Sequence, residues 1–258
     1  MRVKLLKVFA GVLMFGLLLG ASSTAYADAF SLTSFSITNV QFTASTGTAQ
    51  FTLTGAMARA EATNLAQTQN IISNSFPIAQ ASAVVNGASA SATANGATHS
   101  VSGESTASIG GCSCTAGSFA LATLTGTLVL SGAEGDVDVN LSFLRTLLRE
   151  VQTDQFGVLA ESGTFFDLFV NGTPVFSVQV EAMNPIGPNG FARVELTEQV
   201  LRTIRLQGGT ENSIFLRLSS TSLVMNNEVP EPATVVLLVS GLGFMTGVLK
   251  KRRKTAAE

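Results

Sequence analysis

Apolar and polar residues alternate with a period of two along most of the chain between its two ends. The alternation is clearest in Phe30 to Asn39, Thr48 to Gly55 and Asp136 to Phe143. Because successive side chains of a β-strand point to opposite faces, this pattern predicts strands with one buried and one solvent-facing side. The same pattern predicts further strands at 119–130, 164–170, 173–180, 191–196, 200–206 and 213–224.

Turn signals separate these strand candidates. Asn171-Gly172 lies between two of them and predicts a two-residue hairpin turn with both residues at positive φ. The segment 184–189, with its prolines and glycines, is typical of a loop. Residues 56–72 permit a helix despite poor apolar spacing, and residues 144–151 fit either a helical turn or a strand. About ten short strands with frequent turns predict an all-β body, a β-sandwich or jelly roll.

The segment 78–103 is rich in alanine and serine, yet it keeps the same alternation. Alanine alternates with serine, threonine or glutamine, and Asn86-Gly87 and Asn95-Gly96 interrupt the pattern. Asn-Gly is a strong hairpin signal, so one interpretation is a meander of small-residue strands whose alanine faces pack closely against another surface. The other interpretation is a flexible alanine- and serine-rich linker.

Residues 1–27 have the three parts of a secretory signal peptide. A basic start is followed by an uncharged apolar run at 8–20. The small residues Ala25 and Ala27 then supply the spacing that signal peptidase requires. We therefore expect signal peptidase and the export machinery to act on the chain and to leave Asp28 as the first mature residue. The alternative is an N-terminal membrane anchor that is not removed.

The C-terminal end also has three parts in a fixed order. A rigid segment, Pro230-Glu231-Pro232, precedes the uncharged apolar run 233–249. At about 1.5 Å per residue, a helix of this run would be about 25 Å long, the short end of a bilayer span. A basic cluster follows, which would stop transfer and stay on the cytoplasmic side. Its members are Lys250, Lys251, Arg252, Arg253 and Lys254.

This order of parts, over about residues 229–254, resembles the PEP-CTERM sorting signal. The resemblance implies a Gram-negative host that makes extracellular polysaccharide. It also implies an exosortase partner, an integral membrane protease or transpeptidase that recognises the tail. The chain would then lie transiently in the inner membrane before it reaches the cell surface or the exterior. The resemblance concerns sorting and carries no information about the body.

The positive charges of the chain are concentrated near its two ends. Residues 28–229 contain seven Arg and no Lys against 15 Asp and Glu, a formal charge of −8. Such an acidic body argues against nucleic acid as a partner. It also disfavours direct binding to anionic lipid or acidic polysaccharide unless a divalent cation bridges the two.

Two cysteines, Cys112 and Cys114, are separated by a single serine. A bond between them would close a very small and strained ring. They fit free thiols, a local or intermolecular disulfide, or part of a metal site with further ligands.

Candidate catalytic and metal-binding residues are sparse. His99 has Ser100 and Ser102 nearby, but no scaffold for a catalytic triad is evident, so an exposed strand or loop histidine is expected. The acidic positions Glu134, Asp136 and Asp138 would share one face of a strand and could offer oxygens to Ca²⁺. The simpler interpretation is the solvent side of a half-buried strand, and we expect no metal site and no cofactor.

Residues 165–169 place Phe165, Asp167 and Phe169 on one face of a strand and Phe166 and Leu168 on the other. Aromatic rings beside a carboxylate suit a sugar ligand, whereas a strand covered on both faces is the alternative.

Taken as a whole, the sequence favours a non-catalytic, exported surface or extracellular-matrix protein. Exopolysaccharide is a candidate partner of its body. A secreted carbohydrate-binding or carbohydrate-active β-sandwich is the alternative. Two carboxylates converging in an aromatic groove would favour the enzyme, and a closed sandwich would favour the structural role.

Overall fold

The computed structural model describes residues 29–110, 115–153, 158–180 and 190–226. Every regular element in these residues is a β-strand, which confirms the all-β prediction. The twelve strands of this part are β1 (Ala29–Ala44), β2 (Thr48–Asn64), β3 (Thr68–Ser73), β4 (Ile78–Val85), β5 (Ala88–Asn95), β6 (Ser100–Ile109), β7 (Thr115–Ser131), β8 (Asp136–Thr153), β9 (Val158–Val170), β10 (Thr173–Val180), β11 (Gly190–Gln207) and β12 (Glu211–Asn226).

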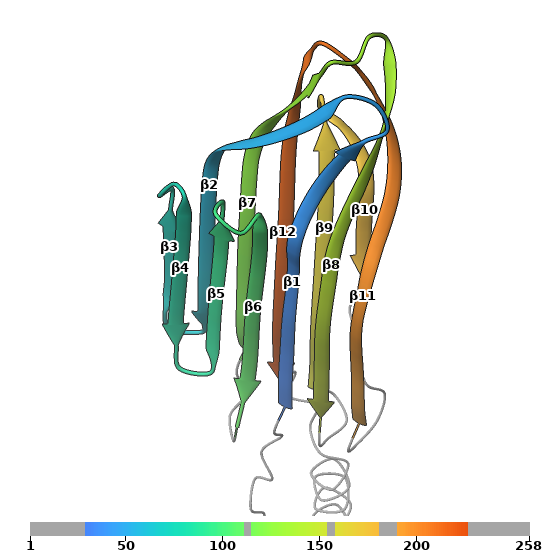
Figure 1. Cartoon of the computed structure of the whole chain (residues 1–258). Coiled ribbons are helices and arrows are strands. Elements are labelled where there is room, and N and C mark those ends of the chain that lie inside the picture. Colours follow the sequence, from blue (N-terminus) through green and yellow to red (C-terminus); the bar gives the residue numbers. More distant parts are fainter. Residues whose placement is uncertain (1–28, 111–114, 154–157, 181–189, 227–258) are drawn as a thin grey trace, which may run out of the picture. The chain divides into compact units, whose positions relative to one another are not determined.

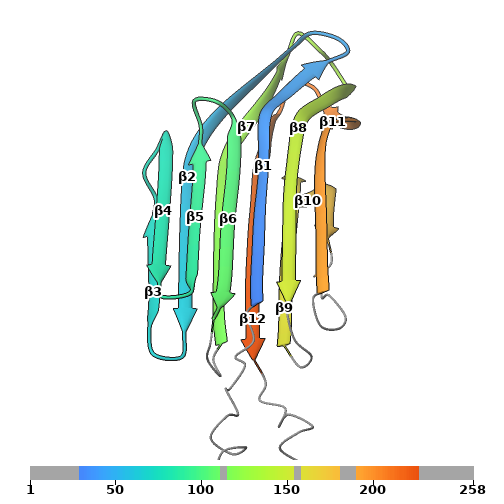
Figure 2. The same cartoon turned by 90° about the horizontal axis from the view of Figure 1, so that it is seen from below.

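The strands form two six-stranded antiparallel sheets that lie face to face (Figures 1 and 2). Sheet A has the order β11-β8-β1-β6-β5-β4, and sheet B has the order β10-β9-β12-β7-β2-β3. The first strand, β1, and the last, β12, both lie in the interior of a sheet. The body is therefore a β-sandwich whose central strands come from opposite ends of the chain.

Several strands are longer than the sequence pattern suggested. The two ambiguous segments are strand: residues 56–64 continue β2, and residues 144–151 lie within β8. In β2, the alanines Ala58, Ala60 and Ala62 are buried while the alternating residues Met57 and Arg59 face outward. Alanine is a good helix former, but its alternation with larger residues fits a strand whose small face packs against another sheet.

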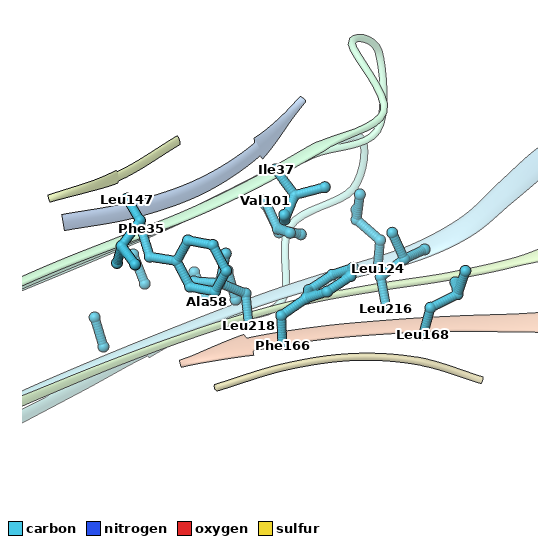
Figure 3. Close-up of a cluster of buried hydrophobic side chains, with 14 of the residues drawn as sticks. Phe35, Ile37, Ala58, Val101, Leu124, Leu147, Phe166, Leu168, Leu216 and Leu218 are labelled. Carbon is cyan, nitrogen blue, oxygen red and sulfur yellow. The ribbon is translucent and has the colours of Figure 1, made fainter. Parts of the chain in front are cut away.

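The space between the sheets holds one apolar core (Figure 3). Sheet A contributes Phe35, Ile37 and Leu147, and sheet B contributes Phe166 and Leu218 among others. The rings of Phe35 and Phe166 meet edge to face with their centroids 6.4 Å apart. Alternating inward residues from both sheets thus fill one shared interior.

The alanine- and serine-rich segment is ordered as β4, β5 and the beginning of β6, so the meander interpretation is confirmed and the flexible linker is wrong. Its alternating alanines point into the core, and most of them are fully buried. The turn at Asn86-Gly87 has Gly87 at φ 82°. The second turn is longer than predicted, because Asn95 Oδ1 accepts hydrogen bonds from the backbone N–H groups of Ala97 and Thr98.

Three connections cross from one sheet to the other at one end of the sandwich: β1–β2, β7–β8 and β11–β12 (Figure 1). They contact one another through backbone groups. Gly208 N–H donates to the carbonyl of Gly135 at 2.7 Å. A Cβ on Gly208 would lie 2.6 Å from the carbonyl oxygen of Ala133, so only glycine fits there. At the opposite end, which we call the lower end, β1 begins and β12 ends.

The two predicted sorting segments lie outside the described residues. They include the predicted cleavage residues Ala25 and Ala27, the proposed motif 230–232 and the basic cluster 250–254. Cys112, Cys114 and the predicted loop 184–189 also lie outside them. Within the described ranges, no helix is long and apolar enough to cross a membrane.

Candidate functional site

One member of the acidic row considered for Ca²⁺, Asp138, forms an ion pair with an arginine. Glu134 and Asp136 are exposed, whereas Asp138 Oδ1 accepts a hydrogen bond from Arg205 Nε of β11 at 3.1 Å. That hydrogen bond and the charge of Asp138, followed by the charge of Asp136, raise the pKa of Arg205. No group of three or more His, Cys, Asp or Glu side chains suited to a metal occurs in the described part of the chain. The Asp138–Arg205 pair links β8 to β11 on the solvent-facing side of sheet A.

His99 is a packing residue of the loop before β6. Its backbone is in the left-handed region at φ 48°, and its ring meets that of Phe51 edge to face at 5.2 Å. Its Nδ1 lies 3.3 Å from the carbonyl oxygen of Val40. The hydroxyl of Ser100 instead contacts that of Thr98 at 2.7 Å, so the structure does not bring histidine and serine together for catalysis.

The residues 165–169 divide between the two faces of β9 as predicted. Phe166 and Leu168 are buried in the core, and Phe165, Asp167 and Phe169 lie on the outer face of sheet B. The Asp167 side chain is nevertheless only 5% exposed, because it is covered on this outer face. Its neutralising partner comes from the adjacent strand.

That partner is Arg217 of β12. Arg217 Nη2 donates to Asp167 Oδ2 at 2.6 Å, and the guanidinium lies 4.8 Å from the centre of the Phe165 ring. Two residues further along both strands, the rings of Phe169 and Phe215 face each other at a tilt of 43° with their centroids 5.9 Å apart. The carboxylate thus holds the arginine over an aromatic ring at a cation–π distance.

The same arrangement recurs further across sheet B. Arg59 of β2 lies 5.9 Å from the ring centre of Phe119 on β7 and donates to Glu61 at 2.7 Å. We call the combined surface the outer aromatic face. It consists of Arg59, Glu61, Phe119, Phe165, Asp167, Phe169, Phe215 and Arg217. Its two carboxylates Glu61 and Asp167 are each paired with a guanidinium, so this face has stacking surface but no free acid–base pair.

A buried arginine, which sequence reasoning missed, lies inside the sandwich toward its lower end. Arg149 of β8 is 1% exposed. Its Nε donates to Ser162 Oγ at 3.1 Å, and its Nη2 donates to the Ser162 carbonyl. Burial lowers the pKa of the guanidinium. The alternation did contain the signal, because Arg149 has the same parity as the core residues Leu147 and Val151.

Hydroxyl groups surround this arginine and make the lower end of the interior polar. Ser222 Oγ donates to the carbonyl of Ser105 at 2.9 Å, and Thr33 Oγ1 donates to the carbonyl of Thr221 at 2.9 Å. Both bonds cross from one sheet to the other. The core is therefore hydrocarbon over most of its length and hydrogen-bonded between the sheets near the lower end.

The outer face of sheet A carries an open, shallow pocket beside a bulge in β1. The register of β1 against β8 shifts between Thr38 and Gln41, and Asn39 has φ 57°. Amides and a hydroxyl line most of the pocket, and no pair of carboxylates converges there. Its lining residues are Asn39, Gln41, Ser142, Phe143, Leu144 and Gln199.

No protein-family model matches the chain, and no curated protein matches its sequence. The fold and the residues described above are therefore the basis for reasoning about the body.

Proposed function

We propose that the chain is a non-catalytic, exported cell-surface or extracellular-matrix protein that an exosortase sorts and processes through its C-terminal tail. The observation that carries this proposal is the sequence of three parts in the tail: Pro230-Glu231-Pro232 comes first, then the apolar run 233–249, and then the basic cluster 250–254. The first described strand begins at Ala29 and the last ends at Asn226. Both sorting segments thus lie beyond the strands, which supports a folded body between two removable ends.

The geometry of the body supports a structural role. The two sheets enclose a continuous core, and the acidic residues nearest to aromatic rings, Glu61 and Asp167, are neutralised by arginines. A glycosidase needs two carboxyl groups flanking a bound sugar, one of them free to give and take a proton. The outer aromatic face offers rings and guanidinium groups that can bind a sugar, and each of its two carboxylates is engaged by an arginine, which favours binding over catalysis there.

Each part of the tail has a distinct physical role in this proposal. Each proline fixes its own φ and keeps the preceding residue out of the α region, so the motif stays extended and accessible to a protease cleft. A helix over 233–249 is long enough to pause the chain in the bilayer but short for a permanent span. The basic cluster then holds the extreme end on the cytoplasmic side.

Alanine substitution of the motif tests the proposal. Replacing Pro230, Glu231 and Pro232 with alanine should leave export intact and block processing, so that the unprocessed chain accumulates in the membrane. The matched variant, neutral residues at 250–254, should instead let some chains pass outward unprocessed. Cell fractionation with an antibody to the body distinguishes the two. Normal amounts of normally sized protein outside cells that carry the alanine variant would refute the sorting role.

Binding of a carbohydrate is the second candidate function, and the outer aromatic face favours it. Flat rings and oriented guanidinium groups suit the faces and hydroxyls of sugars. Replacing Phe165 and Phe169 with alanine should abolish retardation of the protein in gels that contain the host's exopolysaccharide. Phe191→Ala, which removes an exposed ring from sheet A, is the control. Equal retardation of all three proteins would exclude the outer aromatic face as the binding surface.

A further inference from the structure

β11 is an unusually open edge of sheet A. It runs for 18 residues and pairs along its whole length with β8, without a register shift. On its other side, no described strand pairs with it (Figures 1 and 2). The remaining edge strands are much shorter: β3 has 6 residues, and β4 and β10 have 8 each. β10 is also interrupted by Pro174 and a register shift.

Proteins usually protect long edge strands with proline, lysine or a bulge, because unpaired backbone groups recruit other strands. The sequence of β11 contains neither proline nor lysine. It also leaves apolar side chains in solvent, including Leu201, which is 62% exposed, and Val194. A regular and partly apolar edge of this length, protected only by its charged side chains, is suited to pairing with a strand of complementary charge.

The sequence of β11 identifies that strand, because it is complementary to itself. We propose that β11 of one copy pairs antiparallel with β11 of a second copy, about a twofold axis at Val200. Residues equidistant from Val200 then face each other. On the core-facing side the pairs are Val194–Leu206, Leu196–Ile204 and Glu198–Arg202, and on the solvent-facing side they are Glu195–Arg205, Thr197–Thr203 and Gln199–Leu201.

All of these pairs except Gln199–Leu201 are matched in chemistry. Apolar residues meet apolar residues on the side that faces the core, threonine meets threonine, and both glutamates meet arginines. Twofold symmetry repeats each pair, so the two copies exchange four opposite-charge contacts. These cross-strand pairs add to about a dozen backbone hydrogen bonds along the joined edges.

Neighbouring registers lose this match. Side chains must keep their faces, so the axis must lie at a residue, and the nearest alternatives to Val200 are Gln199 and Leu201. An axis at Gln199 brings Arg193 opposite Arg205 and Glu198 opposite Val200. An axis at Leu201 brings Glu198 opposite Ile204 and Arg202 opposite Val200. Of these three registers, the charge pattern favours the axis at Val200, which gives a dimer whose two sheets A form one continuous sheet.

The register can be tested by cysteine cross-linking of the full-length chain in an exporting bacterial host, with Cys112 and Cys114 replaced by serine. Gln199 and Leu201 face each other only when the axis lies at Val200. Co-expressed copies carrying Gln199→Cys and Leu201→Cys, with different tags, should form a disulfide-linked dimer that contains both tags. Either variant expressed alone should cross-link about tenfold less, because its cysteines are offset along the strands. Strong cross-linking of one variant alone, or none in the mixture, would overturn the proposed register.

Charge complementation tests the pairing without cysteines. Glu195→Arg alone makes two Arg–Arg contacts, and Arg205→Glu alone makes two Glu–Glu contacts. Each should weaken dimerisation about tenfold, whereas a mixture of the two restores opposite charges at both contacts and should recover it. Glu134→Arg, which reverses an exposed charge outside β11, is the control. Analytical ultracentrifugation of the detergent-purified full-length chains measures the dimer fraction. A mixture no more dimeric than its components, or a monomeric parent protein, would refute the proposal, which does not depend on how the tail is processed.

Discussion

Enlarging one alanine of the core tests how closely the two sheets approach. Ala92 of β5 is 2% exposed and lies directly beside Gly103 of β6. A Cβ built on Gly103 would already be 3.1 Å from Leu218 Cδ2 and 3.3 Å from the Cβ of Ala120. Sheet B is therefore so near at this point that even a methyl group displaces its neighbours. Ala92→Leu adds three carbon atoms to the same layer.

The expected cost follows from this lack of space. Extra methylene groups in a closely packed core destabilise by about 1–3 kcal/mol, because side chains leave their preferred rotamers and the backbone shifts. For a domain of this size, each kcal/mol lowers Tm by about 2–4 °C, so we expect a fall of about 3–10 °C. The matched control is Ser91→Leu on the exposed face of the same strand, where the change should stay within about 0.5 kcal/mol.

Thermal and urea unfolding, followed by far-ultraviolet circular dichroism, measure the difference between the two variants. If Ala92→Leu and Ser91→Leu had the same Tm, the alanine face would not be in close contact with sheet B. Close packing between the sheets would then not account for the alanine-rich sequence.

Three further predictions concern single positions. Gly172→Val should lower the unfolding free energy, measured with urea, by about 1 kcal/mol or more, and Gly172→Asn should lower it less. The cause is the backbone, because Asn171 and Gly172 have φ 51° and 76° and open space surrounds the glycine. Equal losses for the two variants would exclude this explanation. Arg149→Met should raise the unfolding free energy by about 1 kcal/mol, because it removes a desolvated cation whose described partners are atoms of Ser162. A fall in Tm would show instead that the arginine is a net stabiliser. Edman sequencing of exported protein should begin at Asp28, and a first residue of Met1 would disprove signal-peptide cleavage.

The period-two pattern predicted the faces of the strands well. It placed Phe166 and Leu168 on one face of a strand and Phe165 and Asp167 on the other, as the structure has them, and the Asn-Gly signal located the turn at Asn171-Gly172. These outcomes depend on neighbours along the chain, which the sequence records directly. The pattern could not predict which strands pair. Alternation determines the face on which a side chain lies, but it does not identify the strand that lies beside it.

The errors have physical causes of the same kind. Residues 56–64 permitted a helix on propensity, but the pairing of β2 with β7 and β3 makes them strand. The partners of the acidic row were also invisible in the sequence, since Asp138 and Arg205 are 67 residues apart and meet only because β11 lies beside β8. The outer aromatic face likewise required the β9-β12-β7-β2 order before its arginines could be placed over its rings.

The position of β12 has a consequence for the timing of folding. This strand is last in the body, yet it pairs with β7 along 211–225 and with β9 along 214–226. A chain that leaves the cytoplasm N-terminus first delivers β12 last, and until then sheet B consists of two separate halves. Under the proposed export, the body would stay open during translocation and close only when β12 inserts between β7 and β9. Since β12 ends three residues before Val229, closure of the body and arrival of the proposed sorting motif at the membrane would be nearly the same event.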